Sequence, residues 1–136
     1  MRRKNTTHEM MMGYMATALL ELMLEKDYTK ISIGEIAKKA GVDRSSYYRH
    51  FKSKEDIISF FFDMVLRESL DGFTNLSSID FTLYIHSIYM AFYNYKKEIL
   101  LIYRSNLSSL LLDVLSKRFQ FNEYASNSSL IKQYEL

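Results

Sequence analysis

Cysteine and proline are absent from the 136-residue chain, and glycine occurs only four times. Without cysteine there can be no disulfide framework, no thiolate metal site and no cysteine nucleophile. The absence also fits a reducing compartment, so we expect a cytoplasmic protein. All-β folds need glycine and proline at their many turns, whereas helical chains need few of either. Because 48% of the residues are hydrophobic, this composition predicts an all-α globular fold with a core of its own.

An uncharged apolar run long enough to cross a membrane is also missing. A membrane helix needs roughly 18 or more such residues, and the longest candidate, Phe81 to Tyr95, is shorter and interrupted by polar residues. A secretory signal is the alternative for the N-terminus, since basic residues 2–4 precede an apolar stretch. Glu9 interrupts that stretch, however, and the apolar spacing continues past Ala18, where cleavage would fall. We therefore expect one amphipathic helix there and no membrane attachment.

The sequence signatures of common enzyme and metal sites are missing as well. There is no nucleophile elbow, no phosphate-binding P-loop, no dinucleotide-binding glycine pattern and no HExxH zinc motif. The three histidines, His8, His50 and His86, share no helical ligand spacing. We expect no enzymatic activity, no cofactor and no metal.

Charge is distributed unevenly along the chain. Residues 1–54 hold eleven Lys and Arg against six Asp and Glu, a net charge of +5, which includes a basic arm at residues 2–4. Residues 55–136 hold seven against ten, a net charge of −3. This asymmetry suggests an N-terminal module that faces a polyanion and a body that does not.

Capping signatures predict where the first helices begin. Thr6 followed three residues later by Glu9 fits a capping box, and Ser32 with Glu35 fits a second one. Gly41 should end the helix that Ser32 begins, because glycine readily takes the left-handed conformation that closes a helix. Apolar spacing then predicts helices at about residues 6–26, 33–40, 44–51, 54–70, 79–95, 96–103 and 107–120. Asp43 and Ser53 are the expected caps of the third and fourth helices, and Gly72 is the expected end of the fourth.

The second and third of these helices fit the helix-turn-helix plan. In that plan the last helix lies in the major groove of DNA and the helix before it braces across the backbone. Within 44–51, the four-residue spacing of Tyr47 and Phe51 predicts that both face the core. The side chains expected on the opposite face are Ser45, Ser46, Tyr48 and Arg49. That face carries hydroxyls and a guanidinium but no carboxylate.

Residues 33–56 read IGEIAKKAGVDRSSYYRHFKSKED, and this segment resembles the DNA-binding segment of TetR-family transcriptional regulators. The family pattern has an Ile-Ala pair, an Ala-Gly-Val turn, an aromatic-Tyr pair, a His-Phe or Tyr-Phe pair and a Ser-Lys-Glu entry to the fourth helix. Each has its counterpart here. With the first helix, the resemblance covers about residues 6–70, and the remainder is similar only in being helical. One departure is Asp27, which stands where the family usually ends its first helix with glycine.

The resemblance implies a double-stranded DNA operator as partner. It implies that Arg44, Ser45, Ser46 and Tyr48 contact bases or the adjacent backbone. It also implies that Tyr48, His50 and Lys54 hold phosphates, with Ser32 and Ile33 near the backbone at the start of the second helix. The chemistry agrees, since an arginine can donate two hydrogen bonds to guanine and short serines allow close approach. Arg49 lies on the same face, where a merely solvated charge is an equal alternative.

The same resemblance predicts the overall organisation. Residues 1–54 would form the DNA-binding domain, joined through a long fourth helix to a helical regulatory and dimerisation domain, residues 55–136. The family forms homodimers through two final helices. Here residues 130–136 look like the first turns of a helix that the chain does not complete, so we expect a short or truncated body.

Aromatic residues in the second half are candidates for an effector pocket. The family releases DNA when a small molecule binds, and pockets of this kind are mainly apolar. The residues expected to line such a pocket for a small apolar or aromatic effector are Phe61, Tyr84, Tyr89, Tyr93 and Tyr103. Two alternatives stay open: these residues are ordinary core, or the body binds a partner protein. A closed pocket would favour the effector, and a flat exposed apolar patch would favour the partner protein.

Overall fold

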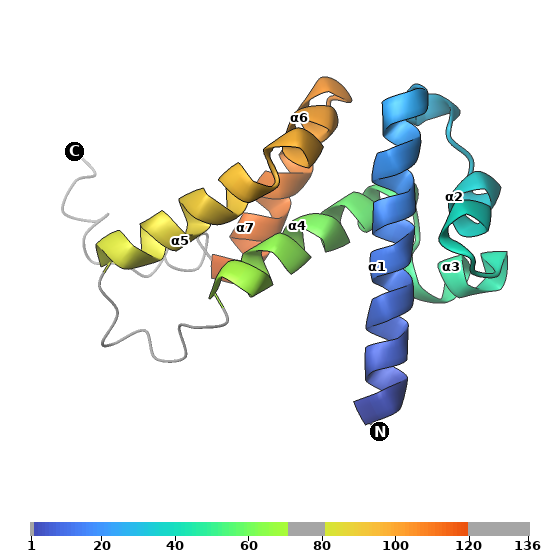
Figure 1. Cartoon of the computed structure of the whole chain (residues 1–136), viewed down its shortest axis with the longest axis horizontal. Coiled ribbons are helices and arrows are strands. Elements are labelled where there is room, and N and C mark those ends of the chain that lie inside the picture. The colour runs from blue at the N-terminus through green and yellow to red at the C-terminus, as the bar shows by residue number, and fades with distance from the viewer. Residues whose placement is uncertain (1, 71–80, 120–136) are drawn as a thin grey trace, which may run out of the picture.

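A computed structural model describes residues 2–70 and 81–119 of the chain. Every regular element within these ranges is helical, which confirms the all-α expectation (Figure 1). In chain order the elements are α1 (Arg2–Glu25), the 3₁₀ turn η1 (Tyr28–Lys30), α2 (Ile33–Ala40), α3 (Arg44–His50), α4 (Lys54–Leu70), α5 (Phe81–Asn94), α6 (Lys96–Arg104) and α7 (Ser109–Phe119).

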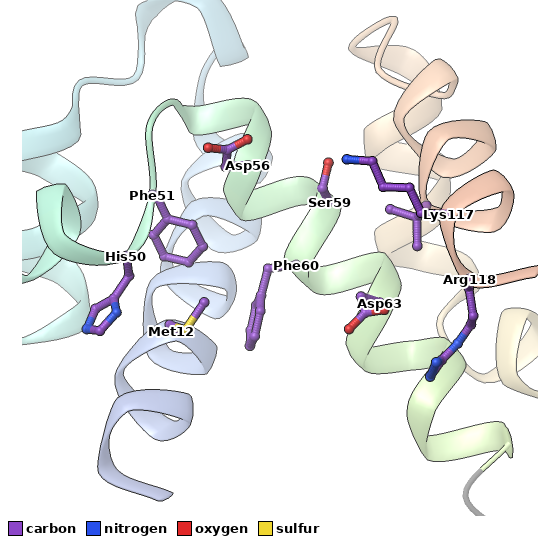
Figure 2. Close-up of a pocket in the computed structure, with 10 residues that line it drawn as sticks. Met12, His50, Phe51, Asp56, Ser59, Phe60, Asp63, Lys117 and Arg118 are labelled. Atoms are coloured by element: carbon purple, nitrogen blue, oxygen red, sulfur yellow. The ribbon is translucent and has the colours of Figure 1, made fainter. Parts of the chain in front are cut away.

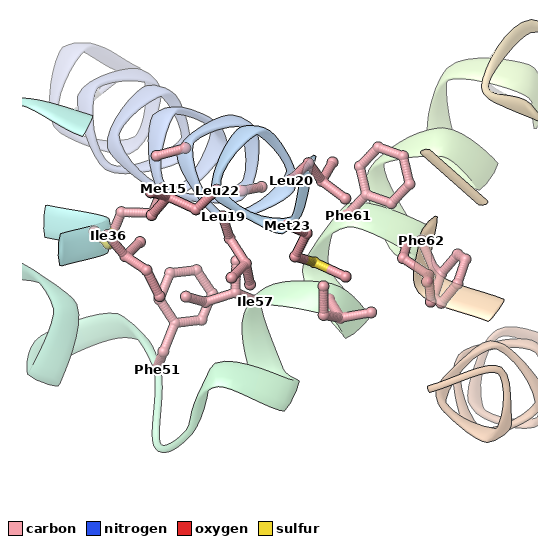
Figure 3. Packing of buried hydrophobic residues seen from close by; sticks show 14 of the residues in the cluster. Met15, Leu19, Leu20, Leu22, Met23, Ile36, Phe51, Ile57, Phe61 and Phe62 are labelled. Carbon is pink, nitrogen blue, oxygen red and sulfur yellow. The ribbon is translucent and has the colours of Figure 1, made fainter. Parts of the chain in front are cut away.

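Helices α1, α2 and α3 and the start of α4 enclose one apolar core (Figure 3). Met15 and Leu19 lie four residues apart on α1, so both point to the same side, and both are fully buried. Ile36 of α2 and Tyr47 of α3 join them and are also fully buried. Burial of a side chain of this size contributes about 1.5–3 kcal/mol. The cluster therefore determines how α3 sits against α1.

Helix α4 leads from this core to the second group of helices (Figure 1). It packs against α1 on one side and against α5 and α7 on the other, while α6 also reaches α1. Ile57, Phe62 and Leu66 of α4 are buried, as is Ile102 of α6. The apolar core is therefore continuous from the helix-turn-helix into the body.

The expected start of the first helix is wrong. Helix α1 begins at Arg2, so Thr6 lies inside the helix and is not its N-terminal cap. Residues 2–5 include no proline or glycine that would stop the helix from extending toward the N-terminus. The basic residues 2–4 thus belong to the first turn of α1 and not to a separate arm.

The end of α1 shows how the chain does without the family's usual glycine. Asp27 takes an extended conformation with φ −59° and ψ 134°, so no left-handed residue is needed. Its carboxylate accepts a hydrogen bond from Thr29 N at 3.2 Å and caps η1. Ser53 caps α4 as expected, since its Oγ accepts from Asp56 N at 3.3 Å. Asp43 occupies the cap position of α3, but its side chain makes no capping hydrogen bond.

Within the described ranges, no single helix is both long and apolar enough to cross a membrane. Helices α6 and α7 meet that test only when taken together, and they are bent by 120° relative to each other. Two expectations, the helix end at Gly72 and the incomplete helix at residues 130–136, lie outside the described residues.

Candidate nucleic-acid interface

Both ends of helix α2 are set by local features that the sequence predicted, a capping box at its start and a glycine at its end. Ser32 Oγ accepts from Glu35 N at 3.1 Å, and the Glu35 carboxylate accepts from Ser32 N at 2.8 Å. Lys26, just past α1, also donates to that carboxylate, and this hydrogen bond is the main cause that lowers the pKa of Glu35. At the other end Gly41 has φ 72°, the left-handed conformation that glycine favours. The turn before α3 is therefore set by local chemistry.

The short helix α3 turns one side to the core and the other to solvent. Tyr47 is fully buried, and Phe51, which follows the helix, is buried as well. Both findings confirm the expected orientation. The exposed side chains of α3 are Arg44, Ser45, Tyr48 and Arg49. Because the helix itself contains no carboxylate, this face presents hydrogen-bond donors and positive charge to the surroundings.

Ser46 does not lie on the exposed face, so that expectation is wrong. It is only 8% exposed and lines a groove beside Met11 and Tyr14 of α1. Helix α1 extends far enough toward its N-terminus to cover this side of α3. The buried arc is therefore wider than the spacing of Tyr47 and Phe51 indicates. A contact between Ser46 and DNA stays a prediction, now for a side chain with little accessible surface.

Arg44, the first residue of α3, lies one helical turn from Tyr48. Its Nη2 donates to the Tyr48 hydroxyl at 3.4 Å, a long and therefore weak hydrogen bond that a base edge could replace at little cost. No carboxylate in the described part of the chain forms an ion pair with Arg44 or Arg49. Both guanidinium groups therefore remain available to DNA.

Three exposed lysines lie close in sequence to α2 and α3 but were not among the residues predicted to contact DNA. Lys30 lies in η1, Lys38 in the last turn of α2 and Lys52 just after α3. None of them forms an ion pair with a carboxylate in the described ranges. The charge excess of residues 1–54 was the signal that could have found them.

His50, the last residue of α3, contacts His8 of α1. The two ring centroids are 4.8 Å apart and the ring planes meet at 61°. His50 is half-buried, and this burial is the main cause that lowers its pKa, with smaller contributions from the charges of His8 and Arg49. The imidazole is therefore mostly uncharged at neutral pH. A phosphate placed against it would have the opposite effect and raise its pKa.

We expect the affinity for DNA to rise as pH falls from about 7.5 to about 6. If His50 contacts a phosphate, its pKa is higher in the complex than in the free protein, so binding takes up protons. The effect is at most about tenfold per pH unit for each titrating group.

The stability of the fold should change with pH in the opposite direction. The pKa of His50 in the folded protein lies below its ordinary value of 6.5. The contribution of uncharged His50 to the free energy of unfolding is therefore present above pH 6.5 and is lost as pH falls through the folded-state pKa.

Anisotropy titrations of a labelled duplex across this pH range would measure the effect. His50→Gln keeps a hydrogen-bond donor but does not titrate, so its affinity should vary less with pH. His8→Gln is the matched control on the other ring and should keep the pH dependence. An unchanged pH profile in His50→Gln would remove His50 from the interface.

Lys54 has partners that the sequence did not indicate. Its Nζ donates to the carbonyl of Tyr28 at 2.8 Å and to the carbonyl of Ile31 at 2.9 Å. The same ammonium lies 4.3 Å from the centre of the Tyr28 ring. Two of its three hydrogens are thus engaged inside the protein. The expected phosphate contact stays untested, with one hydrogen left to make it.

The five residues expected to form an effector pocket differ widely in burial among the described helices, and the pocket itself stays a prediction. Phe61 is buried against Phe62 and Tyr95. Tyr89 and Tyr93 stack on each other on the outer side of α5, with 63% and 51% of their surface exposed. Tyr103 is also exposed, and Tyr84 is half-buried. Helical spacing identified these aromatics, but it could not show which faces would be covered.

Two grooves lie between the helix-turn-helix and the body. One, of about 390 Å³, runs between α1, α4 and α6, and its apolar wall includes Leu20, Phe61 and Tyr95. The other, of about 500 Å³, lies between the end of α3, α4 and α7 (Figure 2). In that groove Lys117 and Arg118 of α7 lie across from α4. Phe61 is the one expected effector residue that lines either of these two grooves.

Residues 16–59, from the middle of α1 to the first turns of α4, match the family model for bacterial regulatory proteins of the tetR family. The matched segment contains the capped α2, the glycine turn and the exposed face of α3. This segment belongs to the TetR family. The resemblance that residues 33–56 carry is thereby confirmed.

Three similar proteins are named as HTH-type transcriptional regulators. EthR of Mycolicibacterium smegmatis is 34% identical over 54 residues, which are 40% of this chain and 25% of EthR. YxbF of Bacillus subtilis, an uncharacterized regulator, is 32% identical over 62 residues, 45% of this chain and 16% of YxbF. AcrR of Shigella flexneri is 48% identical over 40 residues, 29% of this chain and 19% of AcrR. The matches thus span a quarter or less of these relatives. No solved structure matches the chain.

Proposed function

We propose that the protein is a sequence-specific, DNA-binding transcriptional regulator that represses its target by occupying an operator as a homodimer in the cytoplasm. The exposed face of α3 supports this proposal most directly. Arg44 and Tyr48 lie on it shortly after the glycine turn, and no carboxylate among the described residues forms an ion pair with Arg44. One short helix reads only a few base pairs, so two copies related by a two-fold axis would read two half-sites. Residues 1–54 would bind DNA, and residues 55–136 would serve regulation and dimerisation. The proposal includes no catalytic step.

Release of the operator by a small apolar molecule is the first candidate for control. The groove between α1, α4 and α6 supports it, since Leu20 of the DNA-binding half and Tyr95 of the body both line its wall. A ligand seated there would contact both halves of the molecule at once. Phe61, at the same groove, would be its aromatic contact.

Control by a protein partner is the second candidate, and the outer side of α5 favours it. Leu83, Ile85, Tyr89 and Tyr93 are each about half exposed or more. The whole of α5 contains no Lys, Arg, Asp or Glu. An exposed helix face that is rich in apolar side chains and carries no Lys, Arg, Asp or Glu is typical of protein interaction sites. Binding of a partner there would regulate the protein without any small molecule.

The affinity for DNA should depend steeply on salt. If a dimer neutralises about four to six phosphates, the logarithm of the association constant should fall with the logarithm of salt concentration at a slope of roughly −4 to −5. Anisotropy titrations of a duplex between about 50 and 200 mM salt would measure that slope. A flat salt dependence would contradict binding through the phosphate backbone, and the proposed function with it.

A further inference from the structure

Lys54 begins α4, where its positive charge is unfavourable for the helix. It is the first residue of α4, and the N-terminus of a helix carries a partial positive charge that disfavours a cation. Glu55 and Asp56, the next two residues, are the acidic side chains that suit such a position. The placement of a lysine before them therefore calls for an interaction outside α4.

That interaction is with the segment that connects α1 to α2. The ammonium donates to the Tyr28 and Ile31 carbonyls, at 2.8 and 2.9 Å, and lies over the Tyr28 ring. Hydrogen bonds from a charged donor are stronger than neutral ones, and contact with the ring face adds attraction. The Tyr28 ring is buried and Ile31 is 2% exposed. Both ends of the Tyr28–Ile31 segment are thus anchored in the core.

The two carbonyls lie immediately before α2. Ile31 precedes Ser32, whose hydroxyl caps α2, and η1 holds Tyr28 and Ile31 together through the Ile31 N to Tyr28 O hydrogen bond of 3.2 Å. The position of this segment therefore sets where α2 begins. Because α3 follows α2 after the tight turn at Gly41, it also sets how α3 is presented to DNA.

We propose that Lys54 is a positioning residue for DNA recognition, which holds the Tyr28–Ile31 segment from the start of α4 and thereby orients α2 and α3. This inference rests on the proposed function. It differs from a phosphate contact in what it predicts, since a residue that acts through protein geometry contributes no counterion release on binding. Replacement of Lys54 should therefore weaken binding to the specific operator more than binding to non-specific DNA.

The first test needs no DNA. In Lys54→Met, hydrogen exchange of the α2 amides of Glu35 and Ile36 should become about tenfold faster, because the segment before α2 is no longer held. Amides of α1 at Met15 to Leu19 should keep their rates, which also shows that the variant is folded. Lys54→Arg, which keeps a charged donor in reach of both carbonyls, should restore slow exchange in α2. Unchanged exchange at Glu35 and Ile36 in Lys54→Met would overturn the proposal.

The second test measures affinity for a specific and a non-specific duplex over a range of salt, at a temperature where every variant is folded. Lys54→Met should weaken specific binding about tenfold, weaken non-specific binding less than twofold and leave the salt slope unchanged. Lys54→Arg should keep specific binding near that of the original chain. The contrary result is that both duplexes are weakened equally and the salt slope becomes less steep by about one for each contact removed. That result would assign Lys54 to a phosphate contact and overturn the proposal.

Lys30→Met is the matched control, because it removes one exposed charge from the same segment without touching the two carbonyls. It should not accelerate exchange in α2, and equal acceleration would show that charge loss alone causes the effect and would overturn the proposal. Failure of the proposed function is distinguishable from these outcomes. In that case the unaltered chain would bind no duplex, while the exchange experiment would still report whether Lys54 holds α2.

Discussion

Replacing Tyr47 by alanine should lower the free energy of unfolding by about 3–5 kcal/mol, as large-to-small changes of a buried aromatic do. Tyr47 of α3 is fully buried in the apolar core, and the centroid of its ring lies 6.0 Å from that of Phe51 and 5.1 Å from that of Tyr48. Removing the ring leaves a cavity at the centre of the DNA-binding half. Chemical denaturation followed by circular dichroism would measure the loss.

Tyr47→Phe is the matched control for that experiment. The Tyr47 hydroxyl is buried and has no hydrogen-bond partner among the described residues, and burial is the main cause that raises its pKa. Removing a buried hydroxyl that makes no hydrogen bond costs little or even stabilises. Tyr47→Phe should therefore stay within about 1 kcal/mol of the original chain. If alanine were tolerated as well as phenylalanine, Tyr47 would not face the core and α3 would be rotated from its assigned orientation.

Replacing Arg44 by alanine should weaken binding to the preferred operator by about 1–3 kcal/mol and relax specificity at one base position per half-site. Arg44 begins α3, where side chains of a recognition helix meet base edges. Within the described part of the chain, its guanidinium gives up only the 3.4 Å hydrogen bond to Tyr48 when it binds DNA. Because the residue is exposed, stability should change little. Competition binding against operator variants would measure both affinity and specificity.

Arg49→Ala is the control on the same helix face. Arg49 lies nearer the end of α3, where phosphate contacts are expected, so its loss should weaken specific and non-specific duplexes about equally. The salt slope should also become less steep. Should Arg44→Ala behave in the same way as Arg49→Ala, Arg44 would contact the backbone and sequence would be read elsewhere.

The sequence contains two capping-box signatures, but only the one at Ser32 begins a helix. The reason lies in the residues that precede each signature. Ser32 follows the buried Ile31 in extended conformation, so the backbone is already non-helical there and the cap begins α2. Thr6 is preceded by residues that can all continue a helix, and α1 extends through it. A capping signature predicts a helix start only where the preceding chain leaves the helix.

The orientation of α3 could be predicted because it depends on local spacing, whereas contacts between distant segments could not. Tyr47 and Phe51 face the core as their four-residue separation indicates. Ser46 is buried because α1 passes beside it, which spacing within α3 does not reveal. Lys54 reaches carbonyls 26 and 23 residues earlier in the chain. No sequence pattern predicts that the Lys54 ammonium lies within 3 Å of these two carbonyl oxygens.

The aromatic residues of the body show the same limit. Periodicity placed Phe61 and Tyr89 on helices correctly, but the surfaces that cover a helix come from other parts of the chain. Phe61 packs against Tyr95, which lies between α5 and α6, whereas Tyr89 remains 63% exposed. Which aromatic residues line a groove and which face solvent therefore depends on tertiary packing.

Selection of bound sequences from a pool of random DNA duplexes, carried out with the full chain, tests the central claim most directly. A dimer that presents two copies of α3 should enrich an inverted repeat, with half-sites about one helical turn apart. The same selection with Arg44→Ala should lose preference at one position in each half-site. Recovery of no enriched sequence by the unaltered chain would contradict sequence-specific recognition of DNA.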